Sequence, residues 1–136
     1  MDKKNMLVSG LAVYVVHRVL DFAIHAVVLD EAYDATASLW RPEAQAMSNM
    51  WIIFAVGILW AFLFVHIFGW FHKGKGIMEG IQYGFCIGLF VAVPQALNLY
   101  AVTPMPFSLS VSWIVFEMVQ IMICGAVLAL VYRPRN

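Results

Sequence analysis

Long apolar stretches alternate with short polar ones along this chain. Four of the apolar stretches cover residues 6–29, 47–71, 77–100 and 108–132. Each is long enough to cross a bilayer, which takes about 20 helical residues. None alternates strictly between apolar and polar positions, as the shorter strands of a membrane β-barrel would. Because backbone groups in lipid need internal hydrogen-bond partners, each stretch predicts a helix.

The connections between the stretches are short, apart from the one that ends near residue 46. Short connections place consecutive helices side by side and antiparallel. The pattern therefore predicts an all-α fold, an integral membrane four-helix bundle with antiparallel up-down topology, in which residues 1–136 form a single transmembrane domain. Within the long connection, Pro42 and Glu43 favour a helix start, so we expect the second helix to project beyond the membrane.

Composition and charge agree with a membrane location. Of the 136 residues, 63% are hydrophobic and 12% are charged, whereas soluble domains carry about 25% charged residues. The formal net charge is zero, which gives no argument for binding nucleic acid. The lipid bilayer is therefore the expected partner, alongside a homo-oligomer or a larger membrane complex.

The basic residues outside the four stretches are unevenly divided between the two sides of the predicted bundle. One side has Arg41 among acidic residues, and the side of the termini has Lys3, Lys4, Lys73, Lys75, Arg133 and Arg135. Lys and Arg concentrate in cytoplasmic segments of membrane proteins. Both termini are therefore predicted to be cytoplasmic.

The third stretch carries a glycine at every fourth position: Gly76, Gly80, Gly84 and Gly88. This spacing places the glycines along one face of a helix, where small residues let two helix backbones approach closely in lipid. The pattern predicts a packing face. It leaves open whether the partner is another helix of the chain or another subunit.

Residues 17–25, "HRVLDFAIH", place charged side chains inside a stretch that otherwise predicts a membrane span. His17, Asp21 and His25 follow one another by one helical turn, and Arg18 can pair with Asp21 at i, i+3. Each charge at the bilayer centre costs about 2.5 to 3.5 kcal/mol. These side chains are therefore expected to face protein or water.

Other polar residues fall at matching heights on the third and fourth helices. At about 1.5 Å per residue, Asp21 and Glu117 both lie about 22 Å above the inner end of their helices. Gln120 comes level with Arg18, and Gln95 with His25. The predicted polar centre comprises His17, Arg18, Asp21, His25, Gln95, Glu117 and Gln120.

Three interpretations of this centre stay open. It can be a structural network in which Arg18 neutralises a carboxylate, or a site that binds or passes a proton, ion or small ligand. It can also be a metal site built from His25, Asp21 and Glu117, which have suitable ligand types. One ion cannot bind His17, Asp21 and His25 together, because two helical turns span about 12 Å.

The sequence identifies no cofactor and no reaction. It contains no nucleophile elbow, phosphate loop or zinc-protease motif, so an enzyme is not indicated. A haem bound within one chain is not indicated either, because His66 lies near the inner end of its helix, below His17 and His25. The leading functional interpretation is a non-enzymatic protein with a polar intramembrane centre. The alternative is an accessory or scaffolding subunit that docks through the glycine face.

Three segments, "IHAVVLDEAYDATASLWRP", "EGIQYGFCIGLF" and "YAVTPMPFSL", resemble a group of small bacterial four-span membrane proteins. The resemblance covers most of the chain. It implies a location in the bacterial cytoplasmic (inner) membrane. No activity is attached to the group, so the resemblance assigns a role to no residue.

Overall fold

The computed structural model describes residues 3–133, and Arg135, counted above among the cytoplasmic residues, lies outside them. The described chain is helical and has no β-strand. Its elements in order are α1 (Lys3–Ala23), the π-helical turn η1 (Ile24–Val28), α2 (Asp30–Asp34), the 3₁₀ turn η2 (Ala37–Leu39), α3 (Glu43–Ser48), α4 (Met50–Phe71), α5 (Ile77–Val102) and α6 (Phe107–Val131).

Four of these helices are long and apolar enough to cross a membrane: α1 together with η1, α4, α5 and α6. The chain is therefore suited to a multi-pass membrane protein with a helical bundle. Pro42 precedes α3, as its fixed φ favours. However, α3 ends at Ser48 and α4 begins at Met50, so a turn at Asn49 separates the two helices.

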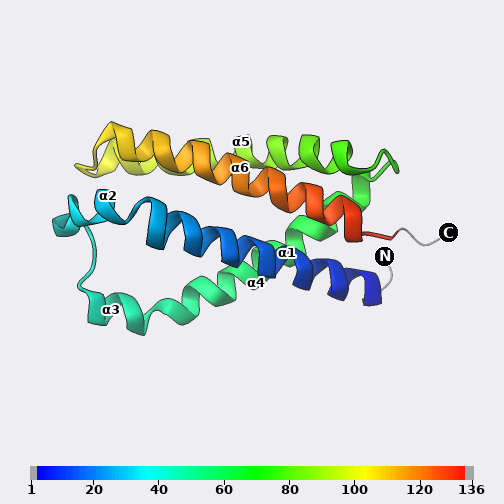
Figure 1. Cartoon of the computed structure of the whole chain (residues 1–136), viewed down its shortest axis with the longest axis horizontal. Helices are drawn as coiled ribbons and strands as arrows, with labels where there is room; N and C mark the ends of the chain where they lie inside the picture. The colour runs from blue at the N-terminus through cyan, green and yellow to red at the C-terminus, as the bar shows by residue number, and fades with distance from the viewer. Residues whose placement is uncertain (1–2, 134–136) are drawn as a thin grey trace.

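The long helices do not pack equally closely, and α5 with α6 is the most closely associated pair. Helices α5 and α6 lie side by side, while α1 packs against both α6 and α4 (Figure 1). Helix α4 crosses α1 and then diverges from it towards α3. Near the loop that joins α4 to α5, the Tyr83 hydroxyl donates a hydrogen bond to the Phe64 carbonyl oxygen at 2.6 Å. At the same end of the molecule, the Asn5 side-chain amide bonds the backbone of Arg133 through two hydrogen bonds.

Glycines allow the backbones of α5 and α6 to touch. A Cβ atom added to Gly80 would lie 2.0 Å from the Gly125 carbonyl oxygen, and one on Gly84 would lie 2.6 Å from the Ile121 carbonyl oxygen. Real Cβ atoms essentially never approach other atoms so closely. The third glycine of the helix, Gly88, faces the flexible Met118 side chain instead, at 2.9 Å.

Gly76 does not take part in this contact. It precedes α5 with a φ of +71°, and an added Cβ would meet nothing within 4 Å. A positive φ is readily adopted by glycine because it lacks a Cβ. Gly76 therefore serves the shape of the α4–α5 loop, while Gly80, Gly84 and Gly88 face α6 of the same chain.

The interior divides into an apolar half and a polar half. The apolar half lies towards the chain ends and includes the fully buried Val13, Phe68, Ile121 and Leu128. The buried Gln120 marks the boundary, because its side-chain amide donates a hydrogen bond to the His17 carbonyl oxygen at 3.0 Å. Beyond Gln120, towards α2, the side chains between α1 and α6 become polar.

Candidate functional site

A change of helix type interrupts α1 within the polar half. His17 and Asp21 lie on the regular helix, whereas His25 lies in η1, where the Leu29 N–H bonds the Ile24 carbonyl oxygen at 2.9 Å. This bond spans five residues, so the turn is wider than an α-helical one. Single π-turns of this kind are frequent at functional sites. His25 lies in this wider turn, whereas Asp21 precedes it.

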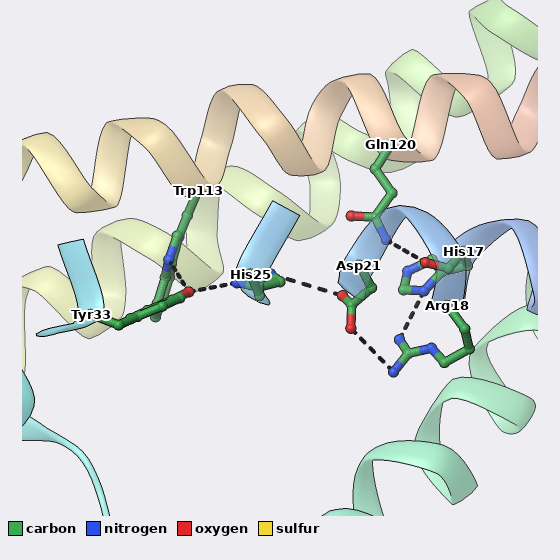
Figure 2. Close-up of polar contacts among 7 residues, drawn as sticks. All are labelled: His17, Arg18, Asp21, His25, Tyr33, Trp113 and Gln120. Carbon is green, nitrogen blue, oxygen red and sulfur yellow. Dashed lines mark hydrogen bonds and ion pairs between the residues drawn. The ribbon is translucent and has the colours of Figure 1, made fainter. Parts of the chain in front are cut away.

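Arg18 holds the inner part of the network together. Its Nη1 lies 3.3 Å from Oδ2 of Asp21, and its Nη2 lies 2.8 Å from Nδ1 of His17 (Figure 2). Since a guanidinium can only donate, His17 Nδ1 accepts, and the proton of a neutral His17 ring is on Nε2. The Arg18 side chain fits against α4 because residue 57 is glycine: an added Cβ there would lie 3.3 Å from the guanidinium carbon.

Tyr33 closes the outer end of the site. Its hydroxyl lies 2.5 Å from Nδ1 of His25 and accepts a hydrogen bond from Trp113 Nε1 at 2.9 Å (Figure 2). The rings of Trp40 and Trp113 surround it, with centroids 5.5 and 6.4 Å from that of Tyr33. Burial raises the pKa of the Tyr33 hydroxyl to about 12. The segment that follows η1 therefore folds back over the polar half.

These hydrogen bonds have one direction that satisfies each group. Trp113 donates to Tyr33, Tyr33 donates to His25 Nδ1, and His25 Nε2 then presents its N–H towards Asp21. The distance from His25 Nε2 to Asp21 Oδ1 is 3.8 Å, which is too long for a direct hydrogen bond. A separation of this size suits a bridging water. Donors from both ends of the network are thus directed towards the Asp21 carboxylate.

Replacing Tyr33 by phenylalanine is expected to change the alkaline stability of the protein. Between pH 10 and about 12, the unfolded Tyr33 loses its proton while the folded one keeps it. Ionisation therefore favours unfolding, and stability falls by about 1.4 kcal/mol per pH unit in this range. Below pH 10 this contribution is constant.

The measurement is the free energy of unfolding in detergent as pH rises through this range. The Tyr33→Phe variant should lack this part of the alkaline loss, whereas Tyr100→Phe, at an exposed tyrosine, should keep it. If the free energy of unfolding falls equally with rising pH in the wild type and in Tyr33→Phe, the buried position of the hydroxyl is contradicted.

A cavity of about 150 Å³ lies beside this network. We call it the polar chamber, and it is lined by His17, Asp21, Ile24, His25, Gln95, Trp113, Phe116, Glu117 and Gln120. The structure thus brings six of the seven residues of the predicted polar centre to one cavity. The seventh, Arg18, lies outside the lining and contacts the chamber through Asp21 and His17. A cavity holds a water at roughly 10 to 15 Å³, so a polar cavity of this size has room for several.

Glu117 differs from Asp21 in its surroundings. Within residues 3–133 its carboxylate has no hydrogen bond and no ion pair, and the residue is partly buried on α6. The Arg18 guanidinium is engaged by Asp21 and His17. With both carboxylates ionised, the chamber therefore carries one negative charge that no described side chain compensates.

A tight metal site is not supported. In the described part of the chain, no group of three or more His, Cys, Asp or Glu side chains is placed to hold a metal ion. Zinc needs ligand atoms about 2.0 to 2.2 Å from the ion. His25, Asp21 and Glu117 share the chamber, but they do not form such a cluster.

Reasoning from the sequence did not identify four residues that shape the site: Tyr33, Trp40, Trp113 and Gly57. Tyr33 follows His25 closely in the chain, and Trp113 lies one helical turn before Glu117 on α6. These spacings are the signals that could have connected both aromatic residues with the polar centre.

No protein-family model, curated protein or solved structure matches this chain. The function is therefore inferred from the chemistry of the polar chamber.

Proposed function

We propose that this protein belongs to the bacterial cytoplasmic membrane, with both termini in the cytoplasm. The four apolar helices support a multi-pass arrangement. The start of α1, the loop that joins α4 to α5 and the end of α6 lie at the same end of the molecule (Figure 1). The basic residues Lys3, Lys73, Lys75 and Arg133 belong to these segments. Positive charge in short segments beside membrane helices favours the cytoplasmic side. The polar chamber then lies in the half of the membrane that faces away from the cytoplasm.

The function we propose is the binding of one small monovalent cation, the proton included, in the polar chamber. The observation that carries this proposal is the uncompensated charge of Glu117 beside Asp21. Arg18 offsets one of these two carboxylates, and a net negative charge in a low-dielectric site is costly. One bound positive charge would balance the chamber.

The dimensions and lining of the chamber support a small ligand. Organic ligands of drug size occupy pockets of about 300 to 1,000 Å³, whereas the chamber has about 150 Å³. Carboxylate, amide and backbone oxygens suit alkali cations and ammonium, and His25 and Asp21 can exchange protons with water. The two donors directed at Asp21 leave the oxygens of Glu117 and Gln95 as the ligands for the cation.

Binding is favoured over passage through the bundle. On the cytoplasmic side of Gln120 the interior is filled by apolar side chains, among them Val13, Ile121 and Cys124, each at most 1% exposed. An ion has no polar partners along such a path. We therefore propose a chamber reached from the α2 end and closed towards the chain ends.

Stability measurements with added cations test this function. A ligand present at 100 times its Kd stabilises the folded state by about 2.7 kcal/mol. At a fixed alkaline pH, at least one of Na⁺, K⁺ and NH₄⁺ should raise the unfolding temperature of the purified protein in a saturable manner. Acidification should remove this response, because protons compete for the same carboxylates.

The decisive variant is Glu117→Gln, which removes the uncompensated charge and keeps the size of the side chain. It should abolish the cation response. Glu43→Gln makes the same charge change at an exposed position and should retain it. If the wild type and Glu117→Gln respond equally to all three cations and to pH, the proposed function is wrong.

The glycine face, which was the expected docking surface of a scaffolding subunit, is occupied within the chain. Gly80, Gly84 and Gly88 face α6 of the same chain, so they are not free to receive another protein. A partner would instead need to use the exposed apolar side chains of α1 and α4, which would also contact lipid in a monomer.

A further inference from the structure

A second groove lies at the opposite end of the bundle from the polar chamber. It occupies about 400 Å³ beside the α4–α5 loop, and its lining residues are Phe68, Phe71, Lys73, Lys75, Glu79, Gln82, Tyr83 and Cys86. We call it the basic groove. Its walls are mainly aromatic and apolar, while two lysines stand at the loop. It shares no residue with the polar chamber.

Glu79 fixes the loop that carries the two lysines. Its carboxylate accepts hydrogen bonds from the backbone N–H groups of Lys73 and Lys75, at 2.5 and 2.7 Å. His72 Nδ1 lies 3.5 Å from the same carboxylate, and both side chains are nearly buried, at 11% and 13% exposed. The negative charge of Glu79 thus stabilises the loop through its backbone N–H groups and His72.

Two glycines make this conformation accessible. Gly74 and Gly76 have φ angles of +72° and +71°, which side chains with a Cβ rarely adopt. The backbone amides of Lys73 and Lys75 point to Glu79, while the two side chains line the groove. Among residues 3–133, neither lysine ammonium takes part in an ion pair. The groove therefore combines two lysines that have no close ion pair with an apolar floor, and the Lys75 charge also acts on the nearby Glu79 carboxylate.

The basic groove lies beside the ends of two helices that can span a membrane, where we expect the boundary between acyl chains and headgroups. Helix α4 ends at Phe71 and α5 begins at Ile77, so the lysines lie just beyond the apolar spans. Trp70, which is 68% exposed, lies at the same level, where tryptophan is enriched in membrane proteins. Phe71 is 67% exposed beside it. An amphiphile in the groove would have its polar part at the loop and its apolar part against α4 and α5.

We propose that the basic groove binds one phospholipid with an anionic headgroup. The phosphate lies between the ammonium groups of Lys73 and Lys75, and an acyl chain runs along Phe71 and Cys86. Basic pockets between membrane helices bind acidic lipids in this way. A soluble anion would leave the aromatic wall without a partner, which is why a lipid is the favoured occupant.

The test uses the purified full-length chain, from which lipid has been removed by detergent exchange. Phosphatidylglycerol, phosphatidylcholine and inorganic phosphate are titrated separately, and binding is measured by native mass spectrometry and by the rise in unfolding temperature. Phosphatidylglycerol should bind with one molecule per chain and raise the unfolding temperature. Phosphatidylcholine and inorganic phosphate should give much smaller effects.

Two variants distinguish the groove from general surface charge. The double variant Lys73→Gln with Lys75→Gln should weaken phosphatidylglycerol binding by about 30-fold. This factor corresponds to about 1 kcal/mol of binding free energy for each lysine. Lys3→Gln with Lys4→Gln makes the same charge change at the same end and should have a small effect. Cys86→Trp fills the apolar part at an exposed position and should also weaken binding.

The proposal is overturned if phosphatidylcholine binds as tightly as phosphatidylglycerol, or if inorganic phosphate alone reproduces the stabilisation. Equal losses in the two double-lysine variants would also overturn it. None of these variants touches the polar chamber, so the cation response of Glu117 is tested independently.

Discussion

Replacing Gly80 by alanine should destabilise the protein by about 3 kcal/mol, although alanine is the better helix former. In a helix interior, Gly to Ala normally stabilises by about 1 kcal/mol. At Gly80, however, the new methyl group would lie 2.0 Å from the Gly125 carbonyl oxygen and 2.7 Å from the Ala129 Cβ. Because backbone atoms cannot rotate away, α5 and α6 must separate, and such overpacking costs about 1 to 3 kcal/mol or more.

Gly88→Ala is the matched control on the same helix and the same face. Its closest neighbour is the Met118 sulfur at 2.9 Å, which a change of side-chain rotamer can move. This variant should be neutral or slightly stabilising. The measurement is the free energy of unfolding in detergent. A Gly80→Ala protein as stable as the wild type would contradict the backbone contact between α5 and α6.

Removing Arg18 is the second change with a large expected effect. The variant Arg18→Met keeps the apolar part of the side chain against Gly57 and removes the charge beside Asp21. Breaking a buried ion pair costs about 3 to 5 kcal/mol when the other charge stays unpaired. The side chains of Arg18 and Asp21 are 18% and 30% exposed, so we expect a loss of about 3 kcal/mol, at the lower end of that range.

A double-mutant cycle separates the ion pair from the general loss of packing. Asp21→Leu alone leaves the guanidinium without its partner, while Arg18→Met with Asp21→Leu removes both charges. The double variant should recover a large part of the loss caused by Arg18→Met, because the chamber then has the same net charge as in the wild type. If the losses of the two single variants simply add, Arg18 and Asp21 do not act as a pair.

The parts of the structure governed by fixed helix geometry could be predicted from the sequence. The apolar stretches indicate four long helices, and their ends differ from α4, α5 and α6 by a few residues. The constant rise per residue brings Glu117 level with Asp21, and both side chains line the polar chamber. These relations depend on local spacing within single helices, which the sequence contains directly.

Contacts that depend on how helices pack could not be predicted in the same way. Helices α4, α5 and α6 are apolar around most of their circumference, so hydropathy alone does not indicate which apolar face meets which neighbour. The fit of Arg18 against Gly57 requires that α1 lies against α4. Similarly, the bond between Trp113 and Tyr33 requires that the segment after η1 folds back towards α6.

The π-turn η1 could not be predicted from the spacing of apolar and polar residues either. Its sequence, IHAVV, contains no proline or glycine that would mark an irregular helix. The additional residue in the turn is stabilised by its surroundings, where His25 bonds Tyr33. A regular helix predicts His17, Asp21 and His25 on one stripe, and all three line the polar chamber although His25 lies in η1.

In the proposed function, one small cation neutralises the uncompensated negative charge that Glu117 gives to the polar chamber. The most direct measurement is isothermal titration of cation-depleted protein in detergent with the cation that stabilises it most, with proton release determined from buffers of different ionisation enthalpy. We expect that each wild-type chain binds one cation, or exchanges one proton for it, and that Glu117→Gln binds none. Equal binding by the two proteins, or no binding and no proton exchange by the wild type, would contradict it.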